Sequence, residues 1–380
     1  MRIKSLLVTL AALGCLTTAS AQVKTSEVLN HYGDLVYANY SDALSGAQAL
    51  QKAVNDFVAA PSDAGLQAAR KAWLDAREWY GQTEAFRFYG GPIDGKNGPE
   101  GQINAWPMDE AYVDSVDGKA GAGIINNRKL GISKKSLAAL NEKDGEENIA
   151  TGWHAIEFLL WGQDLDANGP GKRAYTDFVD GQAPNADRRR QYLKVVTDLL
   201  VDDIGSVTKA WAPKARNYRA NFVRNQANLT KMISAIGILT RGELAGERIE
   251  VALDSQSQED EHSCFADNTH RDVVANAVGI RNVWRGEYKR ADGSTLTGPS
   301  LRDLVNAKDA AVASKVDGQM DATVKAAEAV PAPFDQAILK GNANRPKVEA
   351  VVSALKTQAT GLVEAAGVLG IKRLNTALPE

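Results

Sequence analysis

Cysteine is scarce in this sequence, which has two, Cys15 and Cys264, among 380 residues. Because Cys15 falls in the N-terminal leader described below, the mature chain is expected to keep Cys264 alone, which excludes an internal disulfide even in an oxidising compartment. Long apolar runs are also missing after the leader, where no segment approaches the roughly 20 continuous apolar residues that span a bilayer. The mature protein is therefore expected to be soluble and stabilised by a large core.

An excess of positive charge is lacking too. The chain has 44 lysines and arginines against 47 aspartates and glutamates, a formal net charge of −3. Proteins that bind nucleic acid usually carry a basic surface. Nucleic acid is therefore not an expected partner.

The first 21 residues have the features of a secretory signal peptide. Arg2 and Lys4 precede an apolar run over residues 6–16, and the segment ends in Ala-Ser-Ala. Such a segment is removed on export. The residues before Cys15 make a poor lipoprotein signal, so lipid anchoring through this cysteine is the less favoured alternative. The sequence predicts a protein exported to the periplasm or the cell surface.

Alternation of apolar and polar residues, the pattern of half-buried strands, is nearly absent, whereas helical periodicity dominates. One apolar stripe covers residues 47–57, and a second covers 66–76 after the break APSD at 60–63. Further stripes continue to the C-terminus. The sequence therefore predicts an all-α fold built from helical bundles.

The chain is longer than one hydrophobic core usually accommodates, which predicts two domains. We expect an N-terminal bundle over residues 22–212 and a C-terminal bundle over 213–380. The similar ends of two helical stretches, Trp-x-Gly-Gln from Trp79 and Trp-x-Gly-Glu from Trp284, hint at a duplicated four-helix-bundle-like unit.

The longest stretch without helical periodicity covers residues 90–131 and is rich in glycine, proline and asparagine. Its apolar residues, among them Trp106 and Tyr112, offer surface to bury, which argues against disorder. Ordered segments of this length between helices are usually functional. We expect a loop that packs over the N-terminal bundle.

The segment GWHAIEFLLWG at 152–162 carries one of only four histidines. In a helix, residues three apart share a face, so His154 and Glu157 are expected to point the same way, at the border of the core-facing stripe. A polar group there must find a partner or a ligand. The pair is therefore either a metal-binding unit or an ordinary hydrogen-bonded pair.

A zinc protease helix needs a second histidine, as His-Glu-x-x-His or His-x-x-Glu-His. Here position 158 is phenylalanine, and Ala155 occupies the place of the glutamate in the first form. The other histidines are distant in sequence: His31, His262 and His270. Neither short zinc motif is present.

At these residues the chain resembles a known family. GWHAIEFLLWGQD is similar to the Gly-x-His-x-x-Glu motif of the imelysin family, and EAFRFYGGPID, EGQINAWPMDEAYVD and EDEHSCFADNTHRD resemble its iron-regulated protein A branch. The resemblance extends over essentially the whole mature chain. It implies an exported, all-α protein of two bundle-like halves, associated with bacterial iron uptake, that binds metal through the His-x-x-Glu pair and nearby acidic residues.

Carried over to this sequence, the resemblance implies five candidate metal ligands: His154, Glu157, Glu84, Asp114 and Asp109. Glu84 has an alternative as a solvated side chain or a partner of Arg87. Asp109 has an alternative as the cap of a short helix, because aspartate is favoured there, so Asp114 is preferred of the two. One imidazole with several carboxylates suits iron, or another divalent or trivalent metal, better than it suits a metal that prefers thiolates.

The segment EDEHSCFADNTHRD holds four further potential ligands within nine residues: His262, Cys264, Asp267 and His270. They raise the alternative of a second metal site. Against it, Thr269 followed by Asp272 is a capping-box pattern that opens a helix at His270. A third alternative is that this loop completes the first site across the interface between the halves. Cys264, in a polar segment without a partner, is expected to be dispensable for stability.

Three functions stay open at this point. The sequence favours an exported metal-binding protein of bacterial iron acquisition, whose partners are a metal ion and an outer-membrane or periplasmic iron-transport component. The second is a metallopeptidase, because imelysin is named after an insulin-cleaving peptidase, but the absence of both zinc motifs makes an enzyme the less favoured interpretation. The third is a structural adaptor for an outer-membrane partner, with His154 and Glu157 satisfied in a core.

Overall fold

The computed structural model describes residues 23–378, so the predicted signal peptide and Cys15 lie outside the described residues. Helices dominate the described chain. Its two strands, β1 (Glu287–Lys289) and β2 (Thr295–Thr297), form an antiparallel hairpin in which Tyr288 pairs with Leu296. The predicted all-α fold is confirmed. Between residues 23 and 378, none of the helices is both long and apolar enough to cross a membrane.

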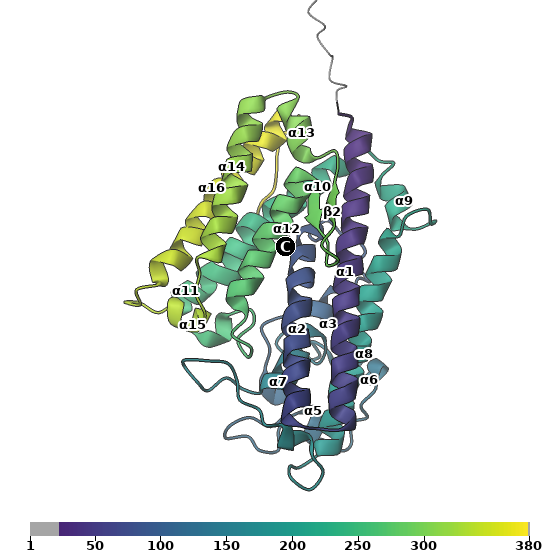
Figure 1. Ribbon diagram of the computed structural model, residues 1–380, viewed down its shortest axis with the longest axis vertical. Coiled ribbons are helices and arrows are strands. Elements are labelled where there is room, and N and C mark those ends of the chain that lie inside the picture. The colour runs from purple at the N-terminus through teal and green to yellow at the C-terminus, as the bar shows by residue number, and fades with distance from the viewer. Residues whose placement is uncertain (1–22, 379–380) are drawn as a thin grey trace, which may run out of the picture.

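The long helices of the N-terminal half lie side by side (Figure 1). They are α1 (Thr25–Ala59), α2 (Asp63–Thr83), α7 (Gly152–Trp161) and α8 (Ala186–Trp211). The apolar stripes predicted at 47–57 and 66–76 are buried between them. α2 begins after the predicted break, where the Ser62 side chain accepts a hydrogen bond from the Gly65 N–H and caps the helix.

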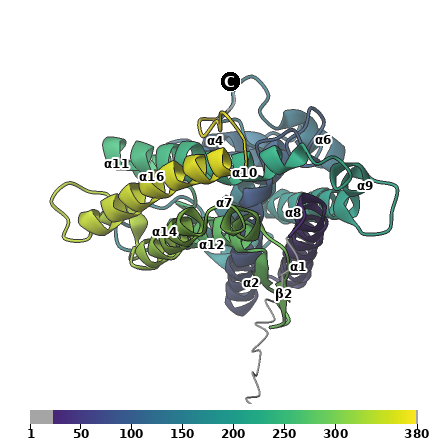
Figure 2. The same ribbon diagram turned by 90° about the horizontal axis from the view of Figure 1, so that it is seen from above.

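The helices of the C-terminal half pack on the other side of the molecule (Figures 1 and 2). The main ones are α10 (Asn228–Ile238), the π-helix η3 (Leu239–Glu250), α11 (Val251–Ser255), α12 (Thr269–Arg285), α14 (Ala310–Glu328) and α16 (Arg345–Val368). α14 packs against α16, and α12 contacts both α14 and α2. Buried side chains of the two halves form one contiguous core. The predicted division at 212/213 falls after α8, and independent folding of the halves stays a prediction.

Short helices connect these elements. They are η1 (Glu84–Phe86), α3 (Glu100–Asn104), α4 (Glu110–Val113), α5 (Gly123–Asn126), α6 (Lys134–Leu140), η2 (Tyr175–Phe178), α9 (Tyr218–Phe222), η4 (Gln258–Asp260), α13 (Leu301–Asn306) and α15 (Phe334–Ala337). Three of them belong to the predicted loop 90–131, whose Ile103 and Val113 are buried. The Trp106 indole N–H donates to the Glu261 carbonyl at 2.8 Å, so this loop also reaches the C-terminal half.

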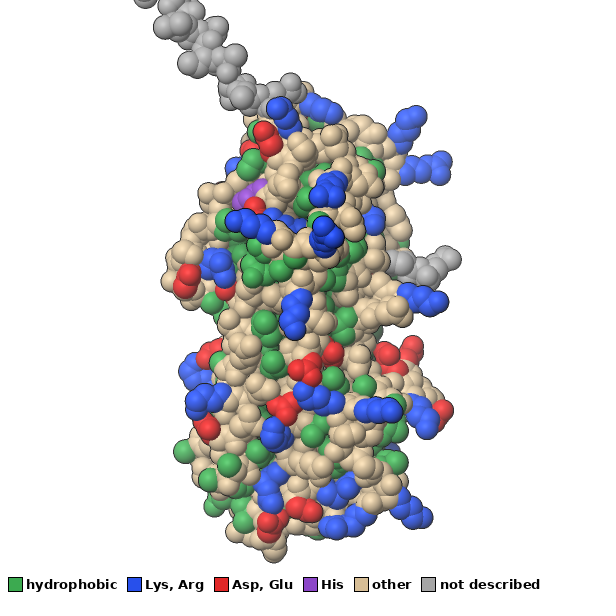
Figure 3. Space-filling view, turned by 90° about the vertical axis from the view of Figure 1, so that its right-hand side faces the viewer, with side chains coloured by type: hydrophobic (Ala, Val, Ile, Leu, Met, Phe, Trp, Pro, Cys, Tyr) green, Lys and Arg blue, Asp and Glu red, His purple; other side chains and the backbone are tan. Residues whose placement is uncertain are grey.

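The outer face that includes α1, α8 and α9 carries mixed charge. Figure 3 shows basic and acidic side chains interspersed on it, with hydrophobic side chains between them. No single sign of charge covers the whole of that face.

Two glycines let α2 and α12 approach each other closely. A Cβ at Gly279 would lie 2.4 Å from the Gln82 carbonyl oxygen, and a Cβ at Gly81 would lie 2.7 Å from the Ala275 Cβ. Neither distance is compatible with a side chain unless the backbone moves. This contact brings the polar residues of α2 next to those of α12, where the candidate site forms.

Gly279→Ala is therefore expected to lower the free energy of unfolding by about 2 kcal/mol, the range of overpacked core substitutions. Gly318→Ala, on an exposed position of α14 with nothing within 4 Å of the new Cβ, is the matched control. It is expected to raise the free energy of unfolding by up to about 1 kcal/mol, the helix-propensity difference. Urea denaturation of both variants measures the two changes, and equal effects would contradict the close contact.

Candidate metal centre

His154 and Glu157 lie together on α7, as the helical spacing predicts. They are 2 % and 0 % exposed, and the His154 Nδ1 lies 2.9 Å from the Glu157 Oε2. The other oxygen of Glu157 accepts a hydrogen bond from the Ala266 N–H at 2.9 Å. Glu157 therefore joins α7 to the loop that precedes α12.

That loop brings a second histidine to the first. The rings of His262 and His154 lie 4.7 Å apart, edge to face. The His262 Nδ1 lies 2.8 Å from Asp272, whose carboxylate also accepts hydrogen bonds from the Ser263 hydroxyl and from Arg77 of α2. The two histidines thus meet where the loop before α12 contacts α7, which is the arrangement that the third alternative for this segment requires.

Each histidine therefore has its Nδ1 bonded to a carboxylate. The Nε2 of His154 is buried without a hydrogen-bond partner. Histidines that bind metal usually bond a carboxylate through one ring nitrogen and present the other nitrogen to the metal. The arrangement of His154 and His262 matches this pattern.

Burial sets the protonation of the centre. It lowers the pKa of His154 well below its usual value, aided by the charges of His262 and Arg77, and it lowers the pKa of His262 to about 4. Burial raises the pKa of Glu157 well above its usual range, although the Ala266 N–H partly offsets this. Both shifts favour the uncharged forms of His154 and Glu157. A cation at the His154 Nε2 would displace a proton from the pair, because a ligating nitrogen needs a free lone pair.

Glu84 lies at the edge of this cluster. Its Oε2 accepts hydrogen bonds from Arg87 and Arg248, both at 2.6 Å, and its buried Oε1 has no partner. Burial alone would raise the pKa of Glu84, but the charges of the two arginines outweigh it and lower the pKa to about 2. The ion pair with Arg87, one of the alternatives set out from the sequence, is present, and Oε1 stays free for another contact.

Glu84→Gln is expected to lower the free energy of unfolding by about 3 kcal/mol at pH 7, because a depressed pKa stabilises the folded protein above the unfolded-state value. The difference between variant and wild type should shrink as the pH falls from about 4.5 toward 2, where the unfolded and then the folded carboxylate take up protons. Urea denaturation at pH 7, 4 and 3 tests this. A difference that does not change with pH would contradict the ion-pair account.

The π-helix η3 supplies Arg248 to this cluster. Residues five apart lie above one another in a π-helix. Arg248 and Glu243 have this spacing, and the guanidinium donates to the carboxylate at 2.8 and 3.0 Å. Arg248 also donates to Asn276 of α12 at 3.0 Å. The π-helix thus holds the Arg248 guanidinium where it donates hydrogen bonds to three side chains, those of Glu243, Asn276 and Glu84.

The chain is similar to known proteins over most of its length. The sequence model of imelysin matches residues 36–362. The chain belongs to the imelysin family. A relative, the iron-regulated protein A of Synechococcus elongatus, is 27 % identical over 323 residues, which cover 82 % of this chain and 77 % of that protein.

A solved structure shares the imelysin fold seen here. It is the crystal structure of a protein from Parabacteroides distasonis, assigned as an iron-regulated protein A precursor. The two structures superpose with a TM-score of 0.70 over 92 % of this chain and 97 % of the other, at 18 % sequence identity. At this identity the match supports the fold alone.

Two candidate ligands of this imelysin-family protein have other contacts. The buried Asp114 accepts hydrogen bonds from Arg189 at 2.6 and 3.0 Å and from Arg173 at 3.1 Å. The exposed Asp109 accepts a hydrogen bond from the Ala111 N–H at 2.9 Å and caps α4, the alternative set out from the sequence. These contacts account for both aspartates without a metal.

The potential ligands of the segment 259–270 do not converge on one site. His262 joins His154, whereas the His270 Nδ1 lies 3.1 Å from the Asp267 carbonyl oxygen. Cys264 lies in the loop before α12, as predicted, but its side chain is buried. Because a serine hydroxyl there would lose contact with water, Cys264→Ser is expected to cost about 1–3 kcal/mol and not to be neutral.

The predicted capping box is also wrong. α12 begins at Thr269, and its first turn has no side-chain cap. The Thr269 hydroxyl accepts a hydrogen bond from the Ser263 N–H at 2.9 Å, and Asp272 is bonded to His262 instead of a backbone N–H. Asp272, which the Thr-x-x-Asp pattern had suggested as part of a helix cap, therefore belongs to the candidate metal centre.

Proposed function

We propose that this imelysin-family protein is exported and binds a metal ion, with iron the favoured metal, in bacterial iron acquisition. The observation that carries the proposal is the pair of buried histidines 4.7 Å apart, each bonded to a carboxylate through Nδ1. His154 and His262 would each offer Nε2 to the metal. Glu157 and Asp272 would orient the two rings, because their oxygens are already engaged by the histidines and other donors.

The remaining metal positions would be filled by oxygen donors. The unpaired Glu84 Oε1 is one candidate, since the charge of His262 contributes to the pKa of Glu84. Water would supply the others. Two imidazoles with oxygen ligands suit iron, zinc or manganese, and the name of the Synechococcus relative favours iron.

The buried charges around the histidines can accept a cation. Three arginines form ion pairs with carboxylates in this cluster: Arg77, Arg87 and Arg248. The cluster contains five carboxylates: Asp272, Glu84, Glu100, Glu243 and Glu157. Four of these carboxylates pair with the three arginines, which leaves one negative charge to balance a bound cation. Burial raises the pKa of Glu157 well above its usual range.

Catalysis has weaker support. His262 supplies the second histidine that the short zinc motifs lack, which favours a metallopeptidase more than the sequence alone does. However, His154, Glu157 and His262 are all buried, and a peptidase must bring a peptide bond to its metal-bound water. We therefore favour binding over peptide hydrolysis.

We further propose the periplasm or cell surface as the location and an iron-transport component as the partner, on the basis of the predicted signal peptide.

Calorimetric titration of the purified mature protein with ferrous iron under anaerobic conditions tests the proposal. One equivalent of iron should bind, and His262→Ala should weaken binding at least about tenfold, which is the lower end of the loss caused by removing even an outer-shell partner of a ligand. His270→Ala is the matched control, because His270 lies outside the centre. Unchanged affinity in His262→Ala would refute the two-histidine centre.

A further inference from the structure

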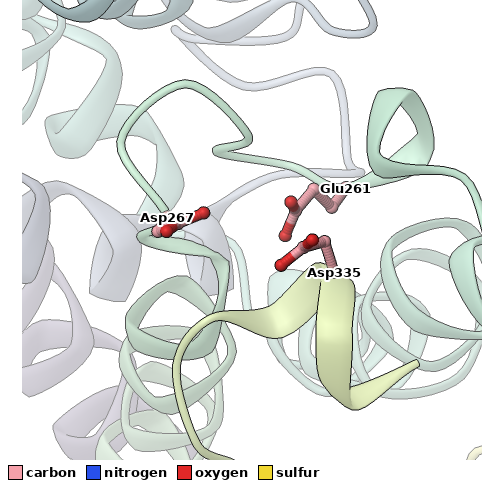
Figure 4. A group of neighbouring side chains, drawn as sticks. All are labelled: Glu261, Asp267 and Asp335. Atoms are coloured by element: carbon pink, nitrogen blue, oxygen red, sulfur yellow. The ribbon is translucent and has the colours of Figure 1, made fainter. Parts of the chain in front are cut away.

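Three carboxylates converge at a second place, outside the candidate metal centre. Glu261 and Asp267 belong to the loop between η4 and α12, and Asp335 belongs to α15. Each offers an oxygen within 4.8 Å of the others. Figure 4 shows Glu261 and Asp335 facing one another, with Asp267 directed toward them. We refer to these three residues as the acidic triad.

The acidic triad is buried and short of hydrogen-bond partners. Glu261 is 0 % exposed, and neither of its carboxylate oxygens has a partner. One oxygen of Asp267 and one of Asp335 are also buried and unpaired. The Thr269 hydroxyl is close enough to offset part of the rise in the pKa of Glu261, but it does not reach hydrogen-bond geometry. Buried carboxylates without partners are costly, so these oxygens indicate a missing ligand.

The charges around the acidic triad are negative. Burial, followed by the charge of Asp335, raises the pKa of Glu261 well above its usual range. Burial and the charges of Asp164 and Asp335 raise the pKa of Asp267 to about 7. Asp164, in the loop after α7, has a pKa raised to about 6 by burial and Asp335. The largest charge effects on Glu261 and Asp267 come from other acids, a setting that favours a cation.

We propose that the acidic triad binds a hard divalent cation of the size of calcium. The donor set is all oxygen, without the imidazole or thiolate that softer metals prefer. Magnesium usually keeps several of its waters, whereas calcium accepts a set of protein oxygens in their place. The three triad carboxylates are all buried and have oxygens within 4.8 Å of one another, which favours calcium.

This second site shares a segment with the candidate metal centre. Residues 261–272 carry two triad carboxylates and also supply His262 and Asp272 to the centre. The same segment donates the Ala266 N–H to Glu157. A cation in the triad thus fixes the loop that brings the two histidines together, and it ties this loop to α15.

Thermal melts with calcium test the second site. Calcium should raise the melting temperature of the wild-type protein by several degrees, as ligand binding to the folded state does. Asp335→Asn and Glu261→Gln should lose this shift. Asp260→Asn, which removes a neighbouring carboxylate outside the triad, should keep it, and so should His154→Ala, which separates this site from the iron-binding proposal. A wild-type melting temperature that is indifferent to millimolar calcium, or an equal shift in Asp335→Asn, would overturn the proposal.

A measurement on the wild-type protein does not depend on how the variants fold. Terbium, which replaces calcium in oxygen sites, should show luminescence sensitised by Trp106, whose indole is bonded to the Glu261 carbonyl at 2.8 Å. Excess calcium should extinguish the emission. Absence of a calcium-displaceable signal would refute the second site, even if iron binds at the histidines.

Discussion

His154→Ala is expected to abolish the thermal stabilisation that iron gives the wild-type protein. A ligand that binds only the folded state stabilises it by RT ln(1 + [L]/Kd), about 2.7 kcal/mol at a hundredfold excess over Kd. Without the imidazole, the Nε2 donor is lost and Glu157 no longer has a ring to orient. The melting temperature with and without iron, measured on the wild-type protein, His154→Ala and the control His270→Ala, checks this result.

The metal-free His154→Ala protein should stay folded. The substitution removes one side chain beside the apolar stripe of α7 but leaves Trp153, Ile156 and Leu160 buried. Loss of one partner of a buried hydrogen bond costs about 1–3 kcal/mol, which a protein of this size tolerates. If instead the wild-type melting curve is indifferent to iron, zinc and manganese at pH 7.5 and His154→Ala unfolds, the pair is core architecture and the binding proposal is wrong.

Arg77→Met is expected to lower the free energy of unfolding by about 3–5 kcal/mol, the cost of leaving one member of a buried ion pair without its partner. Arg77 is fully buried, donates to Asp272 at 3.0 Å and to Asn104 at 2.7 Å, and lies 5.6 Å from the ring of Trp153. Its loss would leave the Asp272 charge uncompensated beside His262. Urea denaturation at pH 7 measures the change.

The control for Arg77 is Arg271→Met. Arg271 pairs with Glu78 between the same two helices at 2.7 Å, but both side chains are more than a third exposed. Surface pairs of this kind contribute at most about 1 kcal/mol. If the two substitutions cost the same, burial does not give the Arg77 pair its importance, and the electrostatic account of the centre fails.

Much of the fold follows from local sequence. The 3.6-residue period predicted α1 and α2, the break at 60–63 and the buried stripes, because each of these depends on neighbours along one helix. The spacing of His154 and Glu157 likewise predicted their contact. By contrast, LTRGELAGERIE at 239–250 has no local feature that distinguishes a π-helix from an α-helix, so the place of Arg248 could not be predicted.

The partners of the motif were harder to predict because they come from distant parts of the chain. Ala266 lies 109 residues beyond Glu157, and Asp272 lies 195 residues beyond Arg77. No periodicity links positions so far apart, and they meet only because α12 packs against α2 at Gly279. Sequence reasoning offered a loop that completes the site as one alternative among three, and the contact of His262 with His154 is the arrangement that this alternative requires.

X-ray absorption spectroscopy of the iron-loaded protein tests most directly the central claim that one metal ion is bound by two histidines, one from each half. The account predicts outer-shell scattering from two imidazole rings in the wild-type protein, reduced to one ring in His262→Ala and unchanged in His270→Ala. A coordination sphere of oxygen alone, or a wild-type protein that takes up no iron, would contradict it.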